Sequence, residues 1–130
     1  MIRRRTPVSE QAMARAQADT ELADRFDELF GQAQTAEREL RAAQAARAPL
    51  AEQQELAKRL DTALTSVMRA GFAAERVAIG PRGYDDRIYR RKAKAKPSVR
   101  RWSLEAQRLL TLRESHRLTG IARLPRTPAA

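Results

Sequence analysis

Apolar residues recur at intervals of three, four and seven in the first part of the chain, which is the spacing of one side of an α-helix. The stripe consists of Leu22, Phe26, Leu29, Phe30, Ala33, Leu40, Ala43 and Ala46. The pair Asp19 and Thr20 offers a cap for this helix, and acidic residues after it suit the positive end of the helix dipole. Because Gly31 interrupts the stripe, one long helix and two shorter helices both remain open. Upstream, Ser9 predicts the cap of a further helix over residues 10–18.

A second helical pattern follows Pro49. Proline excludes the preceding residue from the helical region, so a turn is expected near Ala48. The sequence from Pro49 to Phe72 then predicts a helix that ends at Gly71. Its apolar side carries Leu56, Leu60, Leu64, Val67 and Met68. Two helices joined by a short turn predict an antiparallel helical hairpin over about residues 20–70, and we expect Leu56, Leu60, Leu64 and Met68 to form its core or an association surface.

After Phe72 the pattern changes. Val77 and Ile79 alternate with other residues, "GPRG" follows at 80–83, and Tyr84, Ile88 and Tyr89 come next. This pattern predicts either a small β-hairpin or an irregular loop.

A C-terminal helix is expected beyond Pro97. Its apolar positions are Trp102, Ala106, Leu109, Leu110 and Leu112. Ser103 is a candidate cap and Gly120 a candidate stop, and we expect Trp102 to anchor the helix in the core. The expected fold is therefore mainly α, with a basic, partly ordered arm (1–19), a helical hairpin (20–71), a basic segment with the C-terminal helix (72–120) and a flexible tail (121–130).

Composition makes the expected core small. Leu, Ile, Val and Phe supply 24 of 130 residues, whereas alanine, which buries little area, supplies 25. We expect such a chain to rely on a partner or to leave its ends disordered. The chain has no cysteine, no apolar run long enough for a membrane span and no secretory signal, so the expected location is the cytoplasm.

Charge is divided unevenly along the chain. Residues 1–75 carry 11 basic and 12 acidic side chains, whereas residues 76–130 carry 15 basic and 4 acidic ones. Frequent arginine and alanine are typical of a GC-rich bacterial genome, so isolated arginines carry little weight. Three of the four lysines, Lys92, Lys94 and Lys96, nevertheless fall within five residues. This cluster indicates a polyanionic partner for the C-terminal half.

The stretch "YRRKAKAKPSVRRW" from Tyr89 to Trp102 contains seven basic residues and no acid. It suits a solvated linker, a nucleic-acid contact, or a docking segment for an acidic protein or membrane surface. In the nucleic-acid interpretation, Tyr84, Tyr89 or Trp102 is available to stack on bases. The candidate phosphate-binding residues are Arg87, Arg90, Arg91, Lys92, Lys94, Lys96, Arg100 and Arg101. The triplet Arg3–Arg5 is a candidate second arm.

Catalytic and metal-binding patterns are missing from the sequence. His116, the only histidine, lies among charged residues and is expected to face solvent. Asp85 and Asp86 are expected to form a turn and to pair with nearby arginines. No phosphate-binding glycine loop and no nucleophile or zinc motif occurs. We therefore expect neither an enzyme nor a cofactor or metal site.

The leading hypothesis is a nucleic-acid-associated protein that binds phosphates, of DNA or RNA, through residues 76–117. In this hypothesis the hairpin serves self-association or partner binding. The alternative is a non-catalytic accessory or scaffolding subunit, whose basic segment docks on an acidic protein surface. A regulator that pairs with a toxin or a transcription factor lies between the two.

Overall fold

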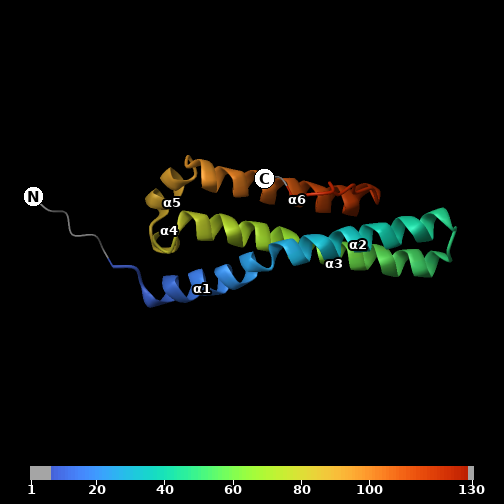
Figure 1. Ribbon diagram of the computed structural model, residues 1–130, viewed down its shortest axis with the longest axis horizontal. Coiled ribbons are helices and arrows are strands. Elements are labelled where there is room, and N and C mark those ends of the chain that lie inside the picture. Colours follow the sequence, from blue (N-terminus) through green and yellow to red (C-terminus); the bar gives the residue numbers. More distant parts are fainter. Residues whose placement is uncertain (1–6, 129–130) are drawn as a thin grey trace, which may run out of the picture.

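The computed structural model describes residues 7–128, which contain six helices and no strand. The helices are α1 (Glu10–Asp24), α2 (Phe26–Ala45), α3 (Leu50–Ile79), α4 (Arg82–Asp85), α5 (Arg87–Ala93) and α6 (Pro97–Thr119). Figure 1 shows α1 and α2 as one bent rod, with α3 returning beside it and α6 running along α3. Helix α3 contacts α1, α2 and α6, while α4 and α5 connect α3 to α6 at one end. The mainly α class is thus confirmed.

Helix α1 begins where Ser9 was expected to cap it, because the Ser9 hydroxyl accepts a hydrogen bond from the Ala12 amide at 3.1 Å. The break before α2 lies at Arg25, and α2 continues through Gly31. The cap predicted at Asp19 and Thr20 is wrong, since both residues lie inside α1.

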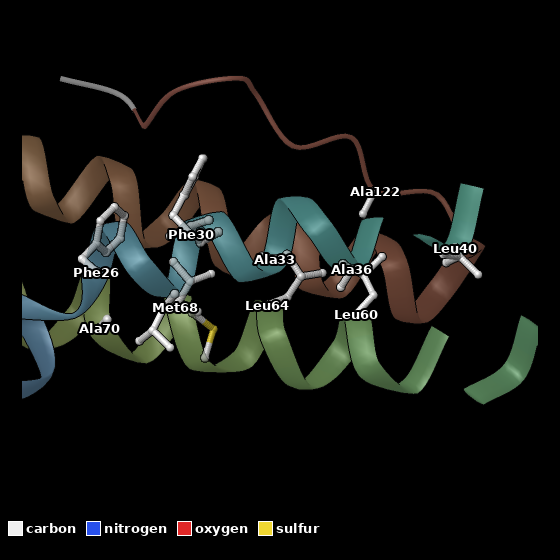
Figure 2. Packing of buried hydrophobic residues seen from close by; sticks show 13 residues of the cluster. Phe26, Phe30, Ala33, Ala36, Leu40, Leu60, Leu64, Met68, Ala70 and Ala122 are labelled. Carbon is white, nitrogen blue, oxygen red and sulfur yellow. The ribbon is translucent and has the colours of Figure 1, made fainter. Parts of the chain in front are cut away.

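Helices α2 and α3 form the predicted antiparallel hairpin. Arg47, in the turn, adopts a positive φ of 51°, and Pro49 precedes α3, so the turn expected near Ala48 is confirmed. Figure 2 shows Leu60, Leu64 and Met68 of α3 in the main core with Phe30 and Ala33 of α2. Leu56 is half-buried at the edge of this core.

Gly71 does not end α3, which continues for two further turns to Ile79. It is buried where α6 crosses: a Cβ added there would lie 3.4 Å from both Cα and Cβ of Ala106. The predicted stop is therefore wrong, because the missing side chain serves close helix packing and not helix termination.

The β-hairpin predicted near "GPRG" is also wrong, because residues 82–85 and 87–93 are helical. Val77 and Ile79 belong to α3, where Ile79 is buried and Val77 is on the surface. Ile79 packs with Ala93 and Val99 in a second, smaller core. Two alternating residues therefore do not distinguish a strand from a helix end. Gly80, with φ of 101°, terminates α3 instead.

Helix α6 starts at Pro97, six residues before the cap predicted at Ser103, and ends as expected at Gly120, whose φ is 73°. Proline fits this first helical turn because it lacks the amide that would otherwise be unpaired. Trp102 is half-buried and meets Phe26 edge-to-face, with ring centres 5.0 Å apart. The expectation that Trp102 anchors α6 in the core is thus confirmed.

The tail at residues 121–128 packs against α2, where we expected a frayed end. The Gln34 amide donates to the carbonyls of Pro125 and Arg126 at 2.9 and 2.8 Å. The Leu124 amide donates to a Glu37 carboxylate oxygen at 3.1 Å, and Ala122 is buried. Residues 121–128 have no regular secondary structure, but side chains of α2 hold them in place. Within the described range, no helix combines the length and apolar character that crossing a membrane requires.

The position of Leu60 gives a test of the core. Leu60 is 1% exposed, so Leu60→Ala should lower the free energy of unfolding by about 2–5 kcal/mol through lost apolar burial and a residual cavity. Leu50 on the same helix is 69% exposed, and Leu50→Ala should change the free energy of unfolding by less than about 0.5 kcal/mol. Urea denaturation measures both, and equal midpoints for the parent and Leu60→Ala would contradict this core.

Candidate nucleic-acid interface

Seven of the eight predicted phosphate-binding residues are exposed, and they lie where α5 turns into α6. They are Arg87, Arg91 and Lys92 on α5, Lys94 and Lys96 in the connection, and Arg100 and Arg101 on α6. We call this set the basic end. The cations were expected on a loop or β-hairpin, but most of them are displayed by helices.

Helix α5 divides its residues between two sides. Asp86 caps it by accepting a hydrogen bond from the Tyr89 amide at 2.9 Å. Arg87 and Arg91 are one turn apart, about 6 Å along the axis, and face solvent, whereas Ala93 is buried. The helix thus fixes the spacing of the backbone positions that carry these cations.

The basic end has no internal counter-charge. No described carboxylate forms an ion pair with any of its seven cations, and the sequence holds no acid from residue 87 to residue 101. The first turn of α6 also lacks acidic residues and a side-chain cap, and Lys96 is its N-cap residue. Cations at the positive end of a helix dipole are unfavourable by a few tenths of a kcal/mol or more each. A bound anion would relieve this repulsion.

Arg90, the eighth predicted residue, faces inward. Its Nη1 donates a hydrogen bond to the Gly83 carbonyl at 3.0 Å, and the residue is half-buried. Gly83 is itself tightly enclosed, since a Cβ there would lie 2.4 Å from Cγ2 of Ile79. Arg90 therefore holds α4 in place, and its position on the inner side of α5 is what distinguishes it from its neighbours.

A polar junction fixes α4 against α1 and α3. The Arg76 guanidinium donates to both carboxylate oxygens of Asp19, at 2.8 and 3.1 Å, and the Tyr84 hydroxyl donates to the same carboxylate. Burial alone would raise the pKa of Asp19, but hydrogen bonds from Arg76 and Tyr84 outweigh it and hold this pKa below its usual value. Burial and the Asp19 carboxylate raise the pKa of Tyr84 to about 12.

The two neighbouring aspartates hold separate elements. Asp85 accepts hydrogen bonds from the amide and hydroxyl of Ser9, both at 2.9 Å, and so ties the start of α1 to α4. Asp86 caps α5 and lies 3.6 Å from the Arg82 guanidinium. The expected pairing with arginine thus holds for Asp86, whereas Asp85 binds a serine.

The aromatic residues are less available for base stacking than the sequence indicated. Tyr84 is engaged with Asp19, and Trp102 packs in the core against Phe26. Tyr89 is half-buried, with the Arg82 guanidinium carbon 4.9 Å and the Lys96 amine 5.9 Å from its ring centre. Arg82 was not among the predicted residues, although its place in "GPRG" puts it next to the basic segment.

His116 is buried, so the expectation that it faces solvent is wrong. It lies on the side of α6 that faces α3, where its Nε2 donates to the Ala57 carbonyl at 2.9 Å. Its charged sequence neighbours concealed this orientation: Arg117 binds Asp61 on α3, while Arg113 pairs with the adjacent Glu114. Among the residues described, no group of three histidine or acidic side chains is arranged to hold a metal ion.

The remaining predicted sites lie elsewhere. Leu60, Leu64 and Met68 are buried within this chain's own core, so their stripe is not an open surface for a partner. The triplet Arg3–Arg5 lies outside the described residues. Comparisons of the chain with protein-family models, with curated proteins and with solved structures found no match.

The polar junction predicts a sensitivity to alkaline pH. The pKa of Tyr84 is about 12 in the folded chain and 10.0 ordinarily, so its stabilising contribution is complete below pH 10 and is lost as the pH rises from about 10 to 12. Urea denaturation across this range should show a loss of stability that is smaller in Tyr84→Phe. Tyrosinate absorbance of the folded parent should include a step near pH 12 that the variant lacks. Equal alkaline losses for both proteins, with the same absorbance titration, would contradict the junction.

Proposed function

We propose that this protein binds nucleic acid through phosphate contacts made by its basic end. The observation that carries the proposal is the gathering of seven exposed, unpaired cations at one end of the described structure, five of them on helices and two in the connection between α5 and α6. An array with fixed spacing and no internal counter-ion suits a regular polyanion better than it suits a solvated linker. DNA and RNA are regular polyanions of this kind.

The proposed contact reads charge and not base sequence. Exposed lysines and arginines without a recognition helix in contact with base edges provide affinity and orientation, whereas specificity requires contacts in the grooves. Binding should therefore be strongly salt-dependent and similar for duplexes of different sequence. The helical bundle supports the basic end and is not itself the contact.

Docking on an acidic protein surface is the second candidate, because the same unpaired cations would serve it. The carboxylates of an acidic protein surface have no fixed spacing. The two candidates therefore differ in how strongly binding depends on salt and in whether nucleic acid competes for the basic end. The hairpin supports this candidate less than expected, since the apolar stripe of α3 is buried in the chain's own core and cannot bind a protein partner.

Salt dependence of duplex binding tests the proposal. If each of the seven exposed cations neutralises one phosphate, the slope of log K against log salt concentration should be about −6. Replacing Lys92, Lys94 and Lys96 with Gln should make the slope shallower by up to about 3 and should weaken different duplexes alike. Fluorescence anisotropy at several salt concentrations measures both quantities.

A matched control removes three charges elsewhere. Arg38, Lys58 and Arg59 are exposed on α2 and α3 outside the basic end, so their replacement by Gln gives the same net charge as the test variant. This control should keep the parent's slope. Equal slopes for the parent and the Lys92, Lys94 and Lys96 variant would sink the proposal. If the parent fails to bind DNA or RNA at about 50 mM salt, the nucleic-acid proposal is wrong and docking on an acidic protein becomes the leading candidate.

A further inference from the structure

Exposed apolar side chains lie beside the basic end, and phosphate binding alone does not require them. Met13 of α1 is 52% exposed and Ile88 of α5 is 68% exposed, while Val8 is at the surface just before α1. Single exposed apolar residues are normal on any protein. Here they line two neighbouring hollows that share Val8 and Arg82, so their grouping next to unpaired cations calls for a ligand with apolar and anionic parts together.

The two hollows differ in charge. The first has Asp85 and Asp86 in its wall beside Arg82 and Arg87, and these carboxylates would repel an anion. The second has a volume of about 610 Å³ and no acidic residue among the described residues that line it. Its apolar wall includes Val8, Met13 and Pro81, and its cations are Arg82 and Lys96. We call this second hollow the Met13 hollow. Its volume falls within the range of about 300–1,000 Å³ that is usual for ligand sites.

Both cations of the Met13 hollow lie near the ring of Tyr89. Arg82 lies over the Tyr89 ring and also approaches Asp86 at 3.6 Å, so its position is fixed from two sides. Lys96 approaches the same ring and has no ion pair among the described residues. The hollow therefore places an apolar wall next to a free ammonium group and an oriented guanidinium.

We propose that the Met13 hollow binds an unpaired base of a nucleic acid, with the adjoining phosphate at Arg82 and Lys96. This inference rests on the proposed function and names its ligand class as single-stranded or locally unpaired nucleic acid. In a closed duplex the ring faces of the bases are stacked on one another and only base edges and the backbone are accessible, whereas an unpaired nucleotide presents an apolar ring face beside its phosphate. An anionic lipid surface also combines both groups, but it requires apolar side chains that project outward, and here Val8 and Met13 line a concavity.

The test compares two oligomers that carry the same phosphates. A thymidine oligonucleotide and an abasic deoxyribose-phosphate oligomer of equal length are titrated at one salt concentration. The parent should bind the thymidine oligomer about fivefold or more tightly, because a base that contacts the apolar wall removes apolar surface from water in addition to its phosphate contact. Met13→Gln replaces one apolar side chain of the wall, at a half-exposed position, with a polar one. It should reduce the ratio of the two affinities and leave binding of the abasic oligomer unchanged.

Leu118→Gln is the matched control, because Leu118 is 83% exposed near the opposite end of α6. It should keep the parent's ratio. Equal affinity of the parent for both oligomers would overturn the base site while leaving phosphate binding by the basic end intact, so the two proposals fail separately. Binding to vesicles of anionic lipid that is as tight as binding to the oligonucleotide, and weaker in Met13→Gln, would reassign the hollow to a lipid surface and also overturn the proposal.

Discussion

The fold depends on the close packing of small residues along α3. A chain with few large apolar side chains gains little stabilisation per helix, so its helices have to approach closely to exclude water. Ala70, Gly71, Ala73 and Ala74 are all buried on α3, and Gly71 meets Ala106 of α6 without an intervening side chain. Larger residues such as Phe26 and Leu64 then fill the space that the small ones leave. Helix α3 can therefore serve as the shared partner of three other helices.

The region that carries the basic end, namely α4, α5 and the start of α6, is stabilised differently from the rest of the bundle. Its own apolar cluster is small, formed by Ile79, Ala93 and Val99 with Tyr89 at the edge. Hydrogen bonds that join distant parts of the chain supplement this cluster, from Arg76 to Asp19 and from Ser9 to Asp85. Directional polar contacts fix orientation more strictly than a few apolar contacts do, so α4 and α5 keep a defined position although the apolar cluster there is small.

Local signals allowed the sequence to predict the hairpin turn, the Ser9 cap, the Gly120 stop and the apolar stripe of α3, because each depends on residues close in the chain. Two of the failures, at Gly71 and His116, depend on contacts between distant residues. Gly71 has the local pattern of a helix stop but packs against Ala106 of α6, and His116 has charged neighbours in sequence but donates its hydrogen bond to Ala57 of α3. At the candidate site the cation cluster was visible in the sequence. The inward orientation of Arg90 and the meeting of Met13 and Lys96 in one hollow were not, since they follow from the packing of α4 with α5 and with α1.

The helical setting of the cations changes what a phosphate contact costs. Cations on a flexible linker lose backbone and side-chain freedom when they bind, whereas α5 and the first turn of α6 have their backbone ordered before binding. The folded chain instead carries the mutual repulsion of seven exposed cations and of the positive end of α6. Binding a polyanion removes that repulsion without ordering new backbone. An array of this kind therefore favours a partner with regularly spaced charges, because its backbone positions are set before binding and its side chains adjust only within their own reach.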